Sequence, residues 1–329
     1  MIVRSCEACG VSNTEILLQN QVHHYIEDNT EETWIYNLVK CKNCGLVFID
    51  PKPTWNILQT FYDTSYGCYD ASINLPENEA ASLKYRLASW RDPINSSINI
   101  KKMMAIGSEW LSGKTISYSL AVPLNLNKDA QIFEVGYGSG NWLRAMAQLG
   151  YHNLYGYDID ANSENVESLE SAGINVTSGI FLDNEYPQEF FDCIRLEHVF
   201  EHLIEPQLVL EKCWHMLKPG GLLVMNFPVG NSISFKISVI HSSIRVSPMH
   251  LYLHTSESIQ LLLKKAKFKN IRSKLYPVSL VGGATLNGVL AERNIKIPSK
   301  VFIALAPIYN VLGQLAKKGD HITLVASKL

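Results

Sequence analysis

Three glycines spaced two residues apart restrict the fold of this 329-residue chain more than any other feature. Ala130–Val135 is a short apolar run, Gly136, Gly138 and Gly140 follow it at once, and a helical pattern begins near Asn141. Glycine accepts positive φ angles and lets a ligand approach the backbone where a helix begins. The segment therefore predicts a strand, a glycine turn and a helix that together bind a nucleoside.

Three details of the surrounding sequence separate the cofactor classes. A dinucleotide-binding turn places its third glycine where this chain has Asn141, which disfavours a nicotinamide enzyme. Asn153–Asp158 predicts a second strand, and its terminal carboxylate could accept both hydrogen bonds from a ribose diol. Glu134 could bind a cationic ligand group directly or through water, and it would repel a pyrophosphate. The pattern favours S-adenosylmethionine, which carries an ammonium group.

The sequence resembles the class I S-adenosylmethionine-dependent methyltransferases over residues 115–275, where Asp192-Cys-Ile and Leu217-Lys-Pro-Gly-Gly-Leu-Leu-Val continue the pattern. The resemblance implies an α/β, Rossmann-like sheet with helices on both faces. It implies that the glycine turn surrounds the methionine part of the cofactor, that Asp158 binds the ribose, and that the residues near position 181 cap the adenine. Asp160 is expected to be a helix N-cap and not a ligand. The expected cofactor-binding residues are Glu134, Gly136, Tyr137, Gly138, Gly140, Asp158, Phe181 and Leu182.

Two Cys-x-x-Cys-Gly units predict a metal site near the N-terminus. Cys6, Cys9, Cys41 and Cys44 supply four thiolates, which suit a tetrahedral zinc ion and leave no coordination position for water. The glycine after each pair lets the chain curl so that backbone N–H groups point at the sulfurs. A predicted strand at Thr33–Val39 allows a hairpin to span the gap. A structural zinc ribbon is favoured over a thioredoxin-like redox pair or unrelated structural cysteines.

Two prolines after this ribbon mark a predicted boundary. Pro51 and Pro53 prevent further sheet pairing. We expect the zinc ribbon at 1–50, a helical linker on the substrate side at 51–118, and the S-adenosylmethionine-binding domain at 119–329. The aromatic residues of the linker are expected to pack in a core in preference to lining a pocket; they are Phe61, Tyr62, Tyr66, Tyr69, Tyr85, Trp90 and Trp110. The three remaining cysteines, Cys68, Cys193 and Cys213, receive no role. Cys193 and Cys213 are expected to lie in the core.

His198-Val-Phe-Glu201-His202 matches an inverted zinc-protease motif, in which two histidines share one helical face. Here the motif follows a predicted strand, Phe191–Leu196, and precedes a predicted helix, which makes a protease improbable. In the methyltransferase family this loop commonly ends in Glu-His and borders the methyl group of the cofactor. Some members hold a divalent metal there, so the pattern leaves a bound ion open. A simpler alternative is that Glu201 only orients His202.

Methyl transfer to a hydroxyl requires a base, and His202 and His250 are the candidates, with Glu201 beside them. The ribbon, the aromatic residues after it and His250 resemble bacterial sugar methyltransferases. Members that methylate sugar carbon have Tyr-x-Glu-His where this chain has Ser247–His250, so only the histidine is kept. O-methylation of a sugar or sugar-containing intermediate is therefore favoured. The alternatives are C-methylation of a nucleotide-linked keto-sugar and a cofactor-binding module that docks a partner without turnover.

Charge and hydropathy limit the partners and the location. A net charge of −2 and a pI near 6.6 give no positive field for nucleic acid, so a small-molecule substrate is favoured. No signal segment or membrane-spanning run is found, which predicts a cytoplasmic protein. The apolar segment Val301–Ala316 is expected to pack on the sheet or in a homodimer, in preference to contacting a membrane. Asp320–Ala326 predicts the closing strand.

Overall fold

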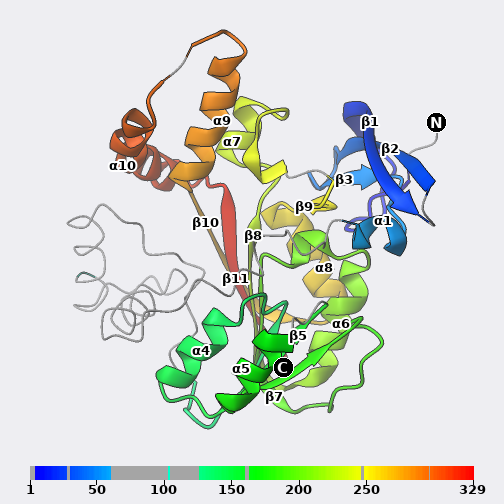
Figure 1. The fold of residues 1–329 in the computed structure, drawn as a ribbon, viewed down its shortest axis with the longest axis vertical. Coiled ribbons are helices and arrows are strands. Elements are labelled where there is room, and N and C mark those ends of the chain that lie inside the picture. Colours follow the sequence, from blue (N-terminus) through cyan, green and yellow to red (C-terminus); the bar gives the residue numbers. More distant parts are fainter. Residues whose placement is uncertain are drawn as a thin grey trace.

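The computed structural model describes residues 4–27, 30–60, 126–159, 163–245, 248–295 and 297–329, together with Met103. Two sheets organise these residues (Figure 1). The larger has seven strands in the order β10-β11-β8-β7-β4-β5-β6, and the smaller has four in the order β1-β2-β3-β9.

The larger sheet is parallel except for two strands at one edge. The strands from β6 to β8 run parallel to one another, whereas β11 pairs antiparallel with β8 and β10 antiparallel with β11. Since parallel strands end at the same edge, the chain segments that follow β4, β5 and β7 lie side by side. The bounds are β4 Gln131–Val135, β5 Asn153–Asp158, β6 Asn175–Ser178, β7 Phe191–Glu197, β8 Leu217–Pro228, β10 Lys269–Tyr276 and β11 His321–Ser327.

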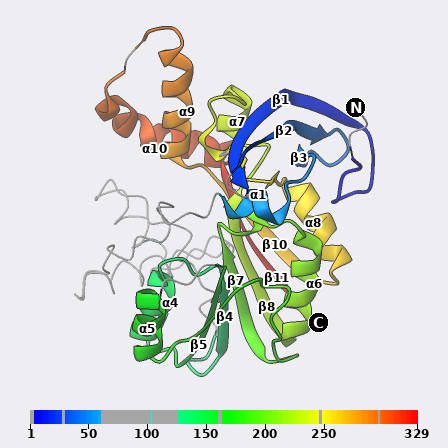
Figure 2. The same ribbon diagram turned by 45° about the vertical axis from the view of Figure 1, so that its right-hand side comes forward.

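Helices cover both faces of this sheet (Figure 2). On one face lie α4 (Asn141–Gln148) and α5 (Ser163–Ser171), and on the other α6 (Pro206–Met216) and α8 (Ser256–Lys265). The helix α4 is amphipathic, because it buries Trp142, Leu143, Ala145 and Met146 on one side. The expected Rossmann-like sheet with helices on both faces is confirmed, as are the strands expected at the glycine turn, at Asp158 and near residue 326.

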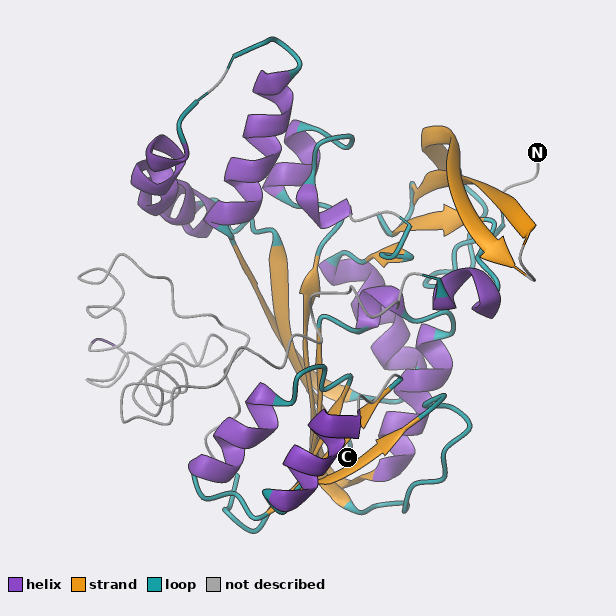
Figure 3. Cartoon of the chain, in the orientation of Figure 1, coloured by secondary structure: helices purple, strands orange, loops and turns teal. Residues whose placement is uncertain are grey.

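A second group of helices lies at the end of the sheet where β8 and β10 finish (Figure 3). Its members are α7 (Ile233–Ile237), the short η4 (Ser243–Arg245), α9 (Ser279–Ala291) and α10 (Ser299–Leu315). The buried Asp320 carboxylate joins α7 to α10, because it accepts hydrogen bonds from the hydroxyls of Ser234 and Tyr309 at 2.7 and 2.8 Å. Among the described residues, no helix has the length and apolar character needed to cross a membrane.

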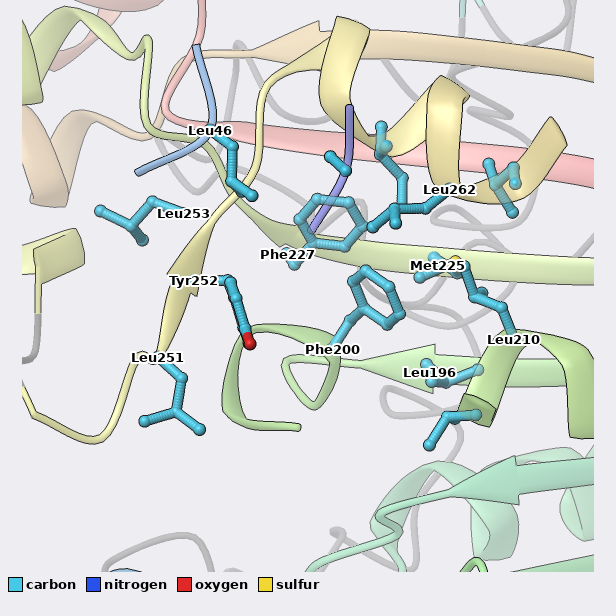
Figure 4. Packing of buried hydrophobic residues seen from close by; sticks show 14 of the residues in the cluster. Leu46, Leu196, Phe200, Leu210, Met225, Phe227, Leu251, Tyr252, Leu253 and Leu262 are labelled. Carbon is cyan, nitrogen blue, oxygen red and sulfur yellow. The ribbon is translucent and has the colours of Figure 1, made fainter. Parts of the chain in front are cut away.

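The smaller sheet is built mainly from the N-terminal hairpin of β1 (Thr14–Glu27) and β2 (Thr30–Cys41) and from β3 (Val47–Asp50). The short helix α1 (Trp55–Gln59) follows β3 in the chain. Its fourth strand, β9 (Tyr252–Leu253), comes from a distant part of the sequence and pairs with β3. Figure 4 shows Leu46 of the ribbon close to the side chains of β9 and to Phe227 of β8. One hydrophobic core therefore continues from the ribbon into the large sheet.

Candidate functional site

The glycine turn lies between β4 and α4. Gly136, Gly138 and Gly140 have φ angles of +72°, +53° and +71°. A Cβ on Gly136 would lie 2.3 Å from a methyl group of Val199, and one on Gly140 would lie 2.7 Å from Leu169. Gly140 is the N-cap of α4 and makes no side-chain cap hydrogen bond, so it does not compete for the first N–H groups of the helix. The turn has the close backbone cradle that a nucleoside cofactor needs.

Asp158 fastens the turn to the end of β5. Its Oδ2 accepts the N–H of Gly138 at 2.7 Å, and the residue is buried. The N–H groups of Gly136 and Tyr137 both donate to the carbonyl of Tyr157, at 2.6 and 3.2 Å. The Tyr137 side chain is also buried. The residue expected to bind ribose thus lies at the glycine turn, as its place at the end of the second strand indicated.

Glu134 is not open to solvent, because Arg195 of the neighbouring strand β7 forms an ion pair with its Oε1. Arg195 also reaches Glu197, at 3.1 Å, and its guanidinium lies over the Trp142 ring. Oε2 of Glu134 is buried and has no hydrogen-bond partner among the described residues. Burial raises the pKa of Glu134, while the charge of Arg195 acts in the opposite direction. A cationic ligand group at this carboxylate would therefore approach the unpaired Oε2.

Arg195 is the residue at this site that the sequence reasoning missed. An arginine between the apolar residues Ile194 and Leu196 of this strand was the available signal, because a buried charge requires a partner. The partner lies 61 residues earlier in the chain. It could be identified only from the register that places Glu134 beside Arg195.

Arg195→Met is expected to lower the free energy of unfolding by about 3 kcal/mol, because it leaves Glu134 and Glu197 buried without their counter-charge. Urea denaturation measures this change. Arg272→Met removes an exposed arginine from β10 and should cost less than about 0.5 kcal/mol. Adding Glu134→Gln to Arg195→Met should recover part of the loss, and equal losses for the two arginine variants would contradict the ion-pair explanation.

Phe181 and Leu182 lie after β6, near the end of β5. The Phe181 ring is buried against Phe133 and Tyr157, with ring centroids 6.3 and 5.1 Å apart. Leu182 is only partly buried. Lys212 of α6 donates to the carbonyl oxygens of both residues, which fixes this segment to α6. Leu182 is therefore the more accessible of the two side chains expected to contact adenine.

The loop after β7 contacts the glycine turn, because Val199 fills the space beside Gly136. His198 has a positive φ angle of 53°, and its N–H donates to the carbonyl of Asn226. Only Phe200–His202 is helical, as the short helix η3. His198 and His202 consequently do not share a helical face. The loop lacks the geometry of a zinc-protease helix, as its sequence context indicated.

Glu201 lies at the centre of a group of histidines. Its side chain is fully buried, and neither carboxylate oxygen has a hydrogen-bond partner among the described residues. Oε1 lies 3.4 Å from Nδ1 of His198, without hydrogen-bond geometry, and 4.0 Å from Nε2 of both His202 and His250. The His202 and His250 rings meet edge to face with centroids 4.7 Å apart. The structure therefore brings together all three residues expected to serve catalysis.

Backbone carbonyls orient the two histidines. Nδ1 of His202 lies 3.0 Å from the carbonyl oxygen of Met249, and Nδ1 of His250 lies 2.6 Å from that of Ile244. A carbonyl can only accept, so each Nδ1 carries the proton and each Nε2 presents a lone pair. Burial lowers the pKa of both histidines, that of His250 to about 4. The carbonyl of Met249 thus orients His202 through Nδ1, while Glu201 lies 4.0 Å from its Nε2.

The four expected zinc ligands also meet. All four sulfurs lie within 4.8 Å of one another, with 3.5 Å between Cys6 and Cys44 and between Cys9 and Cys41. Tetrahedral zinc with bonds of about 2.3 Å needs sulfurs about 3.8 Å apart, so the donor set fits. Backbone hydrogen bonds from Ala8 to Cys6 and from Asn43 to Cys41 match the expected knuckles.

The cysteine cluster is connected to the histidine cluster through β9. The Thr255 hydroxyl donates to the carbonyl of Cys44 at 2.7 Å, and the preceding His254 packs its ring on Phe200 of η3. The Tyr252 hydroxyl donates to Glu7 of the ribbon at 2.6 Å. Cys193 and Cys213 are buried core residues, as expected. The aromatic residues of the expected linker, Cys68 and Asp160 lie outside the described residues.

Comparison with known proteins identifies the type of domain. Residues 113–273 match a protein-family model described as "Methyltransferase domain". Two curated relatives are named ubiquinone biosynthesis O-methyltransferase. The protein from Shewanella sp. (strain ANA-3) is 26% identical over 44% of this chain and 67% of its own length. The protein from Bordetella avium (strain 197N) is 25% identical over 68% of this chain and 95% of its own length. The first of these matches thus spans about two thirds of that relative.

A solved structure is also similar to this chain. It is Haemonchus contortus phosphoethanolamine N-methyltransferase 2 in complex with S-adenosyl-L-methionine. The two share 20% sequence identity with a TM-score of 0.45, over 73% of this chain and 60% of that one.

Proposed function

We propose that this chain methylates a hydroxyl oxygen of a small acceptor. Its Rossmann-like sheet and its match to a methyltransferase domain support a class I S-adenosylmethionine-dependent methyltransferase. The observation that carries the proposal is the meeting of Glu201, His202 and His250 in a loop region that touches the glycine turn. A hydroxyl must lose its proton when it is methylated. Bases next to the methyl donor suit such an acceptor.

The glycine turn and its two carboxylates are the proposed binding site for the methyl donor. Gly136–Gly140 would surround the methionine part, the Oε2 atom of Glu134 would face the ammonium group, and Asp158 and Leu182 would contact ribose and adenine. S-adenosylmethionine supplies an electrophilic methyl group on a positively charged sulfur. The chain itself aligns the acceptor oxygen and removes its proton.

His202 or His250 is the proposed proton acceptor. Each ring is fixed through Nδ1, so its Nε2 lone pair can take the hydroxyl proton. As the O–H bond breaks, the electron pair of the oxygen forms the new O–C bond, and the electrons of the S–C bond remain on sulfur. The products are a methyl ether and S-adenosylhomocysteine, with the proton held on the histidine until it passes to water.

A sugar hydroxyl, free or nucleotide-linked, is the acceptor class that we favour, since the ribbon and His250 resemble sugar methyltransferases. The O-methyltransferase names of the curated relatives support oxygen over carbon, and ubiquinone biosynthesis makes ring hydroxyls a second class to test. C-methylation of a keto-sugar is less favoured, because Ser247 and Met249 stand where the Tyr and Glu of the Tyr-x-Glu-His pattern would be.

Methyl-labelled S-adenosylmethionine tests the proposal directly. Label is expected in a sugar or ring-hydroxyl acceptor, and replacing His202 and His250 together by asparagine should lower kcat at least about 100-fold. The control variant His215→Gln changes an exposed histidine of α6 and should retain full activity. Unchanged product formation in the double variant would overturn the base assignment. Absence of turnover across hydroxyl and keto-sugar acceptors would favour a cofactor-binding module instead.

We also propose that Cys6, Cys9, Cys41 and Cys44 hold one structural zinc ion. All four ligands are thiolates, so the ion would have no open position for a substrate. Its contribution would be to close the N-terminal knuckles of the ribbon.

A further inference from the structure

We propose that α10 is the contact surface between two copies of this chain, and that an apolar stripe on it pairs with the same stripe of the second copy. The α10 stripe consists of five side chains that are 41, 47, 55, 60 and 76% exposed: Val301, Leu305, Ile308, Leu312 and Leu315. The helix lies at the outer side of its group, with α9 between it and α7 (Figure 1). The inference concerns this surface alone and is independent of the acceptor and of methyl transfer.

The spacing of the α10 stripe is that of a helix that packs against another helix. Its five residues follow one another at intervals of four, three, four and three, which is the repeat of a coiled-coil seam. At about 100° per residue they lie within an arc of about 80° on one side of the helix. A seam this narrow suits the side chains of a facing helix.

Another side of α10 is already packed against the protein. The Tyr309 hydroxyl donates to the buried Asp320 at 2.8 Å, and a Cβ on Gly282 of α9 would lie 2.6 Å from the Tyr309 ring. Gly313 is buried, and a Cβ there would lie 2.8 Å from Pro277. These contacts fix the orientation of α10. The α10 stripe therefore points away from the rest of its group, and its side chains stay exposed in the described part of the chain.

The exposed area has the size that a weak dimer needs. Side chains of this size with these exposed fractions present about 500 Å² per copy, so two stripes would bury about 1,000 Å² in total, the lower limit for a specific interface. Val311 lies beside the stripe and is 54% exposed, which adds to this area. An apolar patch of about 500 Å² is also near the largest that a monomer normally exposes. We therefore expect a dimer that dissociates at about micromolar concentrations.

The α10 stripe is nearly symmetric about its middle residue, Ile308. In an antiparallel pair with a twofold axis at Ile308, Leu305 of one copy meets Leu312 of the other, and Val301 meets Leu315. A twofold dimer requires such a patch that is complementary to itself. Antiparallel packing also places the N-terminal end of each helix beside the C-terminal end of the other, which favours the two helix dipoles. We expect this arrangement.

A membrane surface is the competing occupant, because exposed lysines flank the stripe at positions 300, 317 and 318. Helices that lie on membranes carry Lys and Arg along their polar side. Here no charged residue stands between Val301 and Ala316, so the lysines are confined to the two ends. The two occupants differ in their response to salt. Salt screens the attraction of lysines to anionic lipid, whereas an apolar contact between two copies persists.

Analytical ultracentrifugation of the full chain at about 1–100 µM tests the proposal. We expect the mass to rise with concentration from 36.9 kDa towards twice that value. Leu305→Glu places an unpaired charge in the seam and should weaken association at least about 30-fold. Leu208→Glu is the matched control, because Leu208 lies on α6 and is 48% exposed, compared with 47% for Leu305. It should associate as the native protein does.

A charge exchange tests the antiparallel arrangement. In the double variant Leu305→Glu with Leu312→Lys, each introduced carboxylate would face an introduced ammonium group of the other copy. Part of the association lost in Leu305→Glu should then return. Parallel pairing would place like charges opposite each other, so absence of recovery would contradict the twofold axis at Ile308.

A mass of 36.9 kDa for the native chain at every concentration up to about 100 µM would overturn the proposal, whether or not the variants fold. Association that survives Leu305→Glu would overturn it as well, because the copies would then meet at another surface. Circular dichroism checks that this variant is folded. Sedimentation of a monomeric native chain with phosphatidylcholine–phosphatidylglycerol vesicles, reversed by about 0.5 M NaCl, would assign the α10 stripe to a membrane instead.

Discussion

Gly136→Ala is expected to weaken S-adenosylmethionine binding at least about tenfold while the fold remains intact. The residue has a φ angle of +72°, which costs an alanine about 1–2 kcal/mol. The added Cβ would also lie 2.3 Å from Val199 Cγ2, so the loop that carries Glu201 and His202 must move away. Both the cofactor turn and the proposed acceptor site are disturbed by one methyl group. Calorimetric titration with S-adenosylmethionine measures the loss, and circular dichroism checks the fold.

Gly150→Ala is the matched control, because that glycine also has a positive φ angle, +83°, but a Cβ there would meet nothing within 4 Å. It should lower stability by a similar backbone cost and leave cofactor affinity unchanged. The double variant Gly136→Ala with Val199→Ala removes the collision but keeps the backbone strain, so it should recover part of the affinity. Equal affinities for Gly136→Ala and the native protein would contradict the placement of the cofactor at this turn.

The parts of the site that could be predicted from the sequence are those specified by neighbouring residues. Gly136, Gly138 and Gly140 follow an apolar run directly, so one short segment of sequence encodes the strand, the turn and the start of α4. The two Cys-x-x-Cys-Gly units carry their own turn chemistry in Gly10 and Gly45, both of which have positive φ angles. Local constraints of this kind need no knowledge of the remaining chain.

The parts that could not be predicted depend on register and long-range pairing. Arg195 meets Glu134 because β4 and β7 align in parallel, which no local pattern encodes. The Met249 carbonyl that orients Nδ1 of His202 lies 47 residues later in the sequence. The strand β9 is only Tyr252–Leu253, which is too short to show an alternating pattern. It forms because it pairs with the otherwise open edge of β3. The strand β10 has mostly exposed residues, so it lacks the alternation that would have revealed it.

Cys44→Ser is expected to remove one equivalent of zinc and to lower the melting temperature by about 10 °C or more, because folding of a structural zinc site depends on the metal. The effect should extend beyond the ribbon. Thr255 donates to the carbonyl of Cys44, and β3 pairs with β9, so loss of the knuckle loosens the segment that follows His250. Metal analysis and thermal unfolding measure the two effects.

Cys213→Ser provides the control for this last variant, since Cys213 is fully buried in α6 and lies apart from the four clustered cysteines. It should be destabilised by its buried hydroxyl but should keep its zinc. Because β9 joins the ribbon to the histidine cluster while the glycine turn lies on β4, Cys44→Ser should also reduce methyl transfer more than cofactor affinity. Retention of zinc by Cys44→Ser would contradict the four-thiolate site. Equal reductions in transfer and affinity would contradict the connection through β9.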